Sequence, residues 1–197
     1  MPRVIAGTLG GRRFAAPPGE RTRPTSERVR EALASALAAR LPGAVVLDLF
    51  AGSGAYAFEA RSRGAARTVS VDVARQATRV LADNIAALGL TDAEVITADA
   101  RTFCADPRGG PFDLVLADPP YAYPAGALAA CLAALARADA LTPGALIVLE
   151  RDRRDLDALE RVRPAGFAAL RERRYGDTVL VWWRYDGAED VPDADPP

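Results

Sequence analysis

The 197-residue sequence predicts an α/β domain built on a seven-stranded, mostly parallel sheet with helices on both faces. Short apolar segments alternate with longer segments of helical periodicity, which is typical of right-handed parallel strand–helix–strand units. The tight-turn pair Gly176-Asp177 joins the final two strand-like segments, so the last strand is expected to be antiparallel. The predicted strands are 45–49, 68–72, 94–98, 112–117, 145–150, 167–175 and 178–185, and the predicted helices between them are 55–63, 74–88, 125–138 and 152–161.

An appendage of residues 1–42 is expected ahead of the sheet domain, 43–185. Alternating apolar positions on either side of a Gly-Gly pair predict a β-hairpin over 3–15. Apolar residues at helical spacing then predict a helix over 27–40, with Thr25 or Ser26 as its N-cap and a Pro-Gly pair at its end. Together these segments form a small N-terminal hairpin and helix.

Composition excludes several classes of protein. No apolar run approaches the roughly 18–20 residues of a membrane span, and no signal peptide is visible, so we expect a soluble cytoplasmic protein. The chain has no histidine, and Cys104 and Cys131 lie far apart. No metal is therefore expected, and catalysis based on histidine is excluded. Both thiols are expected to fill small spaces in the core.

Charge is segregated along the chain although the net charge is only −1. All 25 basic residues are arginines, and seven of them lie within residues 1–30, beside only Glu20 and Glu27. A basic arm on a nearly neutral body favours a polyanionic partner over a merely solvated surface. The tail, 186–197, holds five acids and no base, and it is expected to be disordered.

The first predicted strand leads through Asp48 into a glycine-rich loop and a helix. Glycines let the backbone approach a ligand, and a helix N-terminus supplies free N–H groups. The loop also fits the dinucleotide fingerprint, so an oxidoreductase stays open, but Asp48 would repel a pyrophosphate and attract the ammonium and sulfonium groups of S-adenosylmethionine. At ~4 Å and an effective dielectric of ~20 that preference is on the order of 4 kcal/mol. The predicted contacts of the donor in this loop are Asp48, Phe50, Ala51, Gly52, Ser53 and Gly54.

Two further acids follow strands. Asp72 could accept from both ribose hydroxyls, and Asp99 could accept from the adenine amine, next to the backbone N–H of Ala100. Because the carboxyl ends of parallel strands share one edge of the sheet, the three acids predict a single pocket.

The fourth strand ends in Asp118-Pro119-Pro120-Tyr121, which predicts methylation of an exocyclic amine on a nucleic-acid base. The lone pair of such an amine is delocalised into the ring, and it is freed when both N–H groups donate to fixed acceptors. The Asp118 carboxylate and the Pro119 carbonyl could be those acceptors, and consecutive prolines aim the carbonyl without later reorganisation. The Tyr121 ring could stack on the base, and Asp118 could take the proton afterwards.

The chain resembles the RsmD-type 16S ribosomal RNA guanine-N2 methyltransferases over about residues 3–185. The resemblance is carried by R-V-I-A-G-x-x-x-G-R-R at 3–13, R-x-R-P-T-S-E-R-V-R-E-A-L at 21–33, D-L-F-A-G-S-G at 48–54, S-R-G-A at 62–65, D-P-P-Y at 118–121 and Y-G-D-T at 175–178. It implies a Rossmann-like class I methyltransferase fold, S-adenosylmethionine as donor and S-adenosylhomocysteine as product.

The resemblance also implies a guanine amine in 16S rRNA as target, within a small ribosomal subunit or an assembly intermediate. We expect the protein to be a monomer. The residues it places on the RNA side are Arg3, Arg12, Arg13, Arg23 and Arg28. Two alternatives remain open at this point: an adenine-N6 methyltransferase acting on DNA or RNA, which uses the same acceptors, and a non-catalytic nucleotide- or RNA-binding module.

Overall fold

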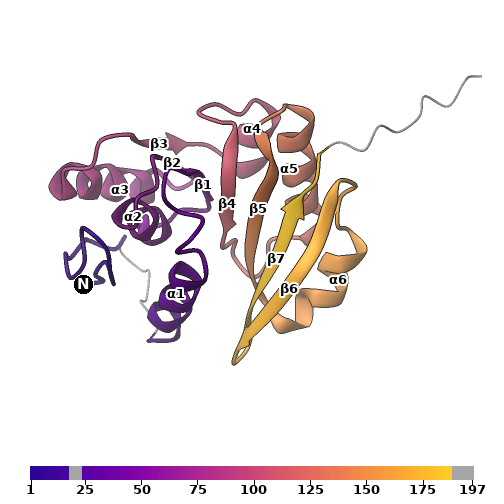
Figure 1. Ribbon diagram of the computed structural model, residues 1–197, viewed down its shortest axis with the longest axis horizontal. Helices are drawn as coiled ribbons and strands as arrows, with labels where there is room; N and C mark the ends of the chain where they lie inside the picture. Colours follow the sequence, from indigo (N-terminus) through magenta and orange to yellow (C-terminus); the bar gives the residue numbers. More distant parts are fainter. Residues whose placement is uncertain (18–23, 188–197) are drawn as a thin grey trace, which may run out of the picture.

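The computed structural model describes residues 1–17 and 24–187, which form a central sheet with helices on both faces (Figure 1). In chain order the elements are α1 (Pro24–Ala36), β1 (Val45–Leu49), α2 (Ala55–Ser62), β2 (Arg67–Asp72), α3 (Arg75–Leu88), β3 (Ala93–Thr97), α4 (Ala100–Ala105), β4 (Phe112–Ala117), α5 (Ala125–Arg137), β5 (Leu141–Asp152), η1 (Arg153–Asp155), α6 (Leu156–Arg161), β6 (Phe167–Tyr175) and β7 (Thr178–Tyr185).

The seven strands lie in the order β3-β2-β1-β4-β5-β7-β6. Strands β1 to β5 pair in parallel, whereas β7 pairs antiparallel with both β5 and β6. The predicted mostly parallel sheet with an antiparallel last strand is therefore confirmed. The chain moves outward from β1 to β3 and then crosses to β4 on the other side of β1. The strand order thus reverses between β1 and β4, which is where open α/β sheets bind their ligands.

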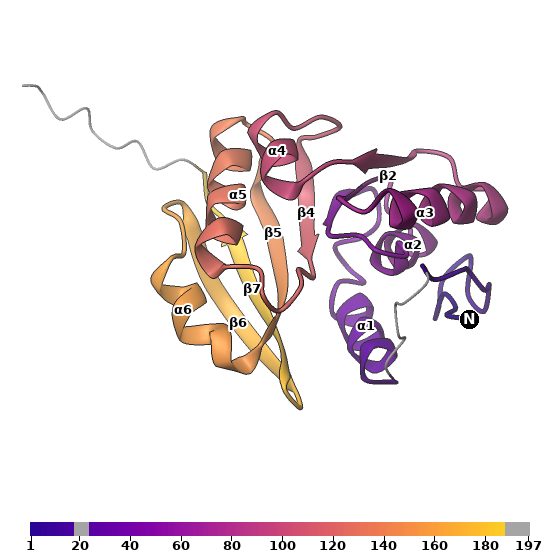
Figure 2. The ribbon, with the colours of Figure 1, turned by 180° about the vertical axis from the view of Figure 1, so that it is seen from behind.

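Two apolar layers hold the sheet. Alternate residues of the strands point to opposite faces. One set packs under α4, α5 and α6, around residues such as Leu132 and Trp183. The other set packs under α1 and part of α2, around Leu33 and Trp182 (Figures 1 and 2). A third cluster joins α2 and α3 to the N-terminal segment through Phe14 and Phe58, whose ring centroids lie 5.0 Å apart. The cores therefore fix the strand tips that border the site.

The N-terminal segment turns back on itself as predicted, but it forms no regular hairpin. The two arms meet at a single antiparallel bridge between Arg3 and Arg13. Around this bridge the Val4 N–H donates to the Arg12 carbonyl at 2.9 Å and the Phe14 N–H donates to the Pro2 carbonyl at 3.1 Å, while other backbone groups bond to side chains of α2. The Ile5 N–H donates to the Glu59 carboxylate at 2.6 Å, and the Leu9 N–H donates to the Ser62 hydroxyl at 2.9 Å. Short antiparallel pairing and docking on α2 therefore hold the segment together.

Other differences are local. Helix α1 starts at Pro24, ahead of the expected N-cap residues, because proline suits the first helical position. It ends at Ala36, and turns of the chain follow. The six-residue helix α4 was not predicted, because one and a half turns show no periodicity. Two predictions fall on residues that the structure does not describe: Arg23 as an RNA-side residue, and disorder over positions 188–197 of the tail. No helix in the described part of the chain is long and apolar enough to cross a membrane.

Candidate active site

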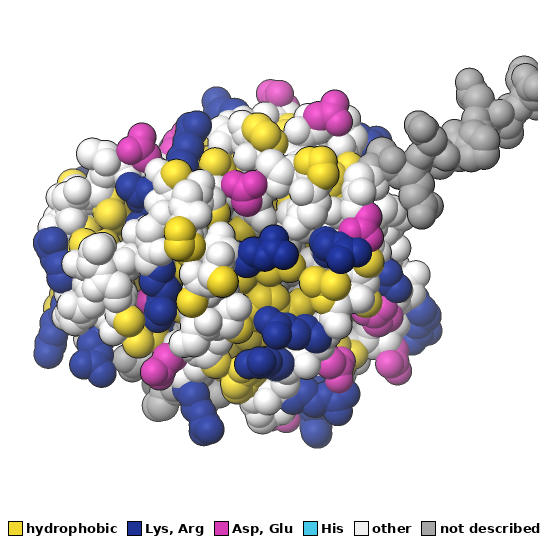
Figure 3. Space-filling view, viewed as in Figure 1, with side chains coloured by type: hydrophobic (Ala, Val, Ile, Leu, Met, Phe, Trp, Pro, Cys, Tyr) yellow, Lys and Arg dark blue, Asp and Glu magenta, His cyan; other side chains and the backbone are white. Residues whose placement is uncertain are grey.

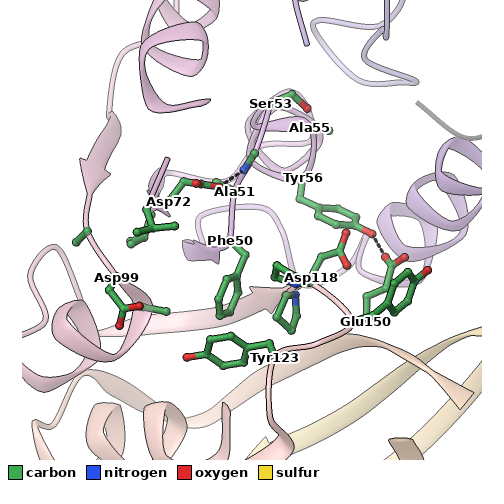
Figure 4. A pocket seen from close by; sticks show the side chains of 18 of the residues that line it. Phe50, Ala51, Ser53, Ala55, Tyr56, Asp72, Asp99, Asp118, Tyr123 and Glu150 are labelled. Carbon is green, nitrogen blue, oxygen red and sulfur yellow. Dashed lines mark hydrogen bonds between the residues drawn. The ribbon is translucent and has the colours of Figure 1, made fainter. Parts of the chain in front are cut away.

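A cavity of about 590 Å³ opens at the carboxyl ends of β1 to β5 (Figure 4). All of the residues predicted for the donor and for catalysis border it except Asp48 and Gly54. The lining residues are Pro2, Arg30, Phe50, Ala51, Gly52, Ser53, Ala55, Tyr56, Val71, Asp72, Val73, Ala98, Asp99, Ala100, Asp118, Pro119, Pro120, Tyr121, Tyr123 and Glu150. Motifs spread over about 150 residues of sequence thus meet in one volume.

The glycine-rich loop between β1 and α2 forms one wall. Gly54 precedes α2 with a φ of 84°, and a Cβ there would lie 2.9 Å from the Phe58 ring and 3.0 Å from Leu81. A side chain at this position would strain the backbone and push the helix off its core. Gly54 therefore lies behind the wall and sets the approach of α2 instead of bordering the cavity.

Asp48 lies beneath the loop, and only 1% of it is exposed. Its Oδ2 atom has no hydrogen-bond partner. Burial raises the pKa of Asp48 to about 7; a hydrogen bond from the Ala57 backbone N–H opposes this, and the nearby Asp72 adds to it. A buried carboxylate with an unsatisfied oxygen favours a cation nearby.

Asp72, at the tip of β2, ties the loop to the second strand. Its Oδ2 atom accepts from the Gly52 N–H at 2.9 Å, and its Oδ1 atom accepts from the Ala74 N–H at 2.8 Å. Each oxygen retains a second lone pair, so Asp72 can still accept from ligand hydroxyls.

Asp99 lies at the tip of β3 as the N-cap of α4, where it accepts from the Arg101 N–H at 2.9 Å. Its side chain is 43% exposed, and it also lies 3.5 Å from the Arg101 guanidinium. Ala100 borders the cavity beside it. The cap holds the Asp99 carboxylate at the rim, where it can still accept a further hydrogen bond.

The turn after β4 forms the opposite wall. The Tyr123 N–H donates to the Pro120 carbonyl at 2.8 Å, which closes the turn. The Tyr123 ring packs edge-to-face on Phe50, with centroids 4.8 Å apart, so the turn contacts the glycine-rich loop. Tyr121 is 59% exposed, and its ring is free of the core.

Sequence reasoning missed a tyrosine–carboxylate pair on the cavity wall. The Tyr56 hydroxyl of α2 donates to the Glu150 carboxylate near the end of β5 (Figure 4). Burial raises the pKa of Glu150, and the hydrogen bond from Tyr56 opposes that shift. Burial first, and then the charges of Glu150 and Asp118, hold the pKa of Tyr56 well above its usual value. Glu150 was visible in the sequence as one more acid at a strand end.

The N-terminal segment supplies the rest of the rim through Pro2, next to Arg30 of α1. Arg30 is 7% exposed; it donates to the Arg3 carbonyl at 2.9 Å and lies 3.5 Å from the Glu59 carboxylate. Glu59 also binds the Ile5 N–H. This buried ion pair fastens the segment to α1 and α2 beside the cavity.

The predicted RNA-side arginines have different surroundings. Arg12 donates to the Ala87 and Leu88 carbonyls at 2.8 and 3.3 Å, so it caps the C-terminal end of α3. Arg3, Arg13 and Arg28 are exposed. Arg23 lies outside the described residues.

Comparison with known sequences relates the chain to one family. The family described as Conserved hypothetical protein 95 matches residues 2–184. Ribosomal RNA small subunit methyltransferase D of Haemophilus influenzae is 32% identical over 177 residues, which is 88% of this chain and 89% of that protein. The protein of the same name from Escherichia coli is 40% identical over 119 residues, so the match spans 60% of each chain, less than two thirds of that relative.

Comparison with solved structures agrees. The structure of yhhF from Escherichia coli has a TM-score of 0.81 at 34% identity, and the match covers 95% of this chain and 98% of that one. Solved methyltransferases of lower identity share the fold as well. The predicted Rossmann-like class I methyltransferase fold is therefore confirmed.

Proposed function

This chain belongs to the Conserved hypothetical protein 95 (RsmD) family, and from that premise we propose that it transfers a methyl group from S-adenosylmethionine to the exocyclic N2 amine of a guanine in 16S ribosomal RNA. One observation carries the proposal: Asp72 and Asp99, the acids suited to the ribose and adenine of the donor, border the same cavity as the turn 118–121. The names of its relatives support ribosomal RNA of the small subunit as the substrate class.

The donor half of the cavity fits S-adenosylmethionine by its chemistry. The unpartnered Oδ2 atom of Asp48 lies beneath the loop, so its charge is suited to the positive methionine end. Asp72 and Asp99 are placed for the ribose hydroxyls and the adenine amine, and Phe50 and Ala100 offer apolar contact along the wall. When bound, S-adenosylmethionine supplies a methyl group already activated on a sulfonium sulfur and leaves as S-adenosylhomocysteine.

The acceptor half positions the base. Asp118 and the Pro119 carbonyl accept the two N–H groups of the amine, which turns its lone pair toward the methyl carbon. The new N–C bond forms as the S–C bond breaks, with the electron pair of that bond returning to sulfur. The amine then sheds one proton, which passes to Asp118. Tyr121, exposed at the rim, stacks on the base and holds it in line.

RNA outside the target base meets an arginine-rich surface. Figure 3 shows arginine side chains around an apolar hollow on the face that carries α1, β6 and β7. The guanidinium of Arg171, on β6, lies 4.2 Å from the centre of the Trp182 ring. Exposed Arg13 and Arg28 add positive charge from the N-terminal segment and α1. Arginine binds phosphate in a bidentate manner and stacks on bases, so this surface suits a structured RNA.

The test is transfer of tritiated methyl from S-adenosylmethionine to naked 16S RNA, to small ribosomal subunits lacking the modification, and to DNA, followed by nucleoside analysis. We expect N2-methylguanosine in ribosomal RNA and one S-adenosylhomocysteine per methyl group. N6-methyladenosine would favour the adenine alternative. Donor binding without transfer to any substrate would favour a non-catalytic module. Binding of NAD but not of S-adenosylmethionine would overturn the assignment of S-adenosylmethionine as the donor.

A further inference from the structure

Asp118, which directly follows β4, and Glu150, near the end of β5, lie next to each other on adjacent strands. Strands β4 and β5 pair with Ala117 opposite Leu149, so the next residue on each strand is an acid. Both acids border the cavity (Figure 4). Neighbouring strands lie roughly 4.8 Å apart. The two carboxylates can therefore contact neighbouring atoms of a single planar ligand.

Tyr56 fixes the second carboxylate. Its hydroxyl, which keeps its proton because its pKa is raised, donates to Glu150 Oε2. That bond orients the carboxylate, which has two oxygens and several lone pairs, so Glu150 keeps the capacity to accept from a ligand. Tyr56 comes from α2 and Glu150 from β5, so the pair is set by the fold and not by a flexible loop.

Guanine and adenine differ at the atom next to the reactive amine. The amine at C2 of guanine is adjacent to N1–H, which is a second donor. The amine at C6 of adenine is adjacent to N1, which carries a lone pair and accepts. A carboxylate placed beside N1 accepts a hydrogen bond from the N1–H of guanine. Beside adenine, the same carboxylate faces the lone pair of N1, and no proton lies between the two acceptors. A buried polar atom left unpaired in this way is costly.

We propose that Glu150, held by Tyr56, accepts the N1–H of the target base while Asp118 accepts from its amine, and that this pair selects guanine over adenine. The inference rests on the proposed methyl transfer and names the groups that choose the base. Asp118 alone is indifferent to the choice, because both bases offer it the same amine.

The test uses reconstituted small subunits whose 16S RNA carries either guanosine or the 2,6-diaminopurine riboside at the position that the wild-type enzyme methylates. The two bases share the 2-amino group, and only guanine has N1–H. We expect wild-type kcat/KM to favour guanine by at least about 100-fold. Glu150→Gln should lower kcat/KM on guanine by about 10- to 100-fold. It should also shrink the preference at least tenfold, because the amide N–H can donate to the N1 atom of diaminopurine.

Tyr56→Phe is the matched variant: it keeps Glu150 and removes only the hydroxyl that orients it, so the preference should shrink in the same direction by a smaller factor. Affinity for S-adenosylhomocysteine should stay within about twofold of wild type in both variants, because neither residue is assigned to the donor. Unchanged preference in both variants would overturn the proposal, as would a wild-type enzyme that methylates both bases equally. If Glu150→Gln loses S-adenosylhomocysteine binding, the test rests on Tyr56→Phe: its ratio of kcat/KM on guanine to kcat/KM on diaminopurine must then be smaller than that of the wild type. A wild-type enzyme that methylates no RNA would instead contradict the proposed function.

Discussion

The guanidinium of Arg151 donates a hydrogen bond to the Tyr123 carbonyl at 2.9 Å, which ties the turn after β4 to the core of β5. The same nitrogen lies 2.8 Å from the Asp155 carboxylate, and Arg151 is only 3% exposed. Because Tyr123 closes the turn that begins at Asp118, this buried arginine holds the turn that carries the proposed amine acceptors.

Arg151→Lys should therefore lower kcat through misplacement of the turn. A lysine keeps a positive charge, but its side chain is shorter, so its ammonium cannot take the place of the guanidinium nitrogen that binds both Tyr123 and Asp155. We expect kcat to fall roughly tenfold with donor affinity retained, because geometry of the acceptors matters most in the transition state. Arg154→Lys, at an exposed arginine bound to Asp152, is the matched control. Equal kcat in both variants would remove Arg151 from the positioning of the turn.

Asp118→Ala should remove one amine acceptor and the proton acceptor together. Turnover should fall by about 10²- to 10⁴-fold, while calorimetry with S-adenosylhomocysteine should give wild-type affinity. The control is Asp157→Asn, at an exposed acid of α6. Near-normal methyl transfer by Asp118→Ala would place the chemistry elsewhere.

Asp48→Asn should change how stability depends on pH. The folded pKa is about 7 and the reference value is 3.8, so the folded protein binds more protons than the unfolded chain between these values. Stability contributed by this group is therefore lost as pH rises from about 4 to 7. The free energy of unfolding of Asp48→Asn relative to wild type should increase over that interval, by no more than about 4 kcal/mol. Thermal melts of both proteins at several pH values measure this change.

The same substitution should weaken donor binding, because an amide offers no charge to the cation. In the wild-type protein, affinity for S-adenosylmethionine should increase as pH rises toward 7, since Asp48 must lose its proton. Calorimetry from pH 5.5 to 8 measures both effects. A pH-independent affinity in the wild type, matched by Asp48→Asn, would exclude the carboxylate from donor binding.

Tyr121→Ala should lose stacking worth ~1–3 kcal/mol on the target base, seen as reduced kcat/KM on RNA. Tyr121→Phe keeps the ring and should lose far less. Because Tyr121 is exposed, neither change should alter the melting temperature. Equal losses in the two variants would assign the effect to the hydroxyl.

Arg12 and Arg13 form a matched pair with opposite expected effects. Arg12→Ala removes a cap from α3 and should lower the melting temperature by roughly 2–4 °C. Arg13→Ala should leave stability unchanged and weaken RNA binding with a shallower salt dependence, because its guanidinium is exposed to a phosphate. Filter binding at several salt concentrations and thermal melts distinguish them. The reverse pattern would place Arg12 on the RNA.

Much of the sheet could be predicted, because each inner strand is a short apolar run and each strand tip carries a polar residue. The same rule, applied at Asp48, Asp72, Asp99 and Asp118, extends to Glu150 at the next strand tip. Arg151, one residue further on, could not be foreseen, because an arginine is rarely buried and its partner Tyr123 is set by a turn.

The N-terminal segment keeps the antiparallel pairing of the predicted hairpin only around Arg3 and Arg13. An alternating apolar pattern does not show how far two arms pair, because contacts with distant side chains can also satisfy the backbone. Here Glu59 and Ser62, more than 50 residues later in the chain, take the Ile5 and Leu9 N–H groups. Side chains on a distant helix leave no trace in a local pattern, and the short helix α4 was missed for lack of any pattern.

Pro2 on the rim of the cavity has a practical consequence for anyone who produces this protein. Residues fused ahead of Met1 begin beside this cavity, so an amino-terminal affinity tag would crowd its rim. A purification handle placed after residue 187 avoids that rim, and enzymes carrying the two kinds of tag should not be compared as if they were equivalent.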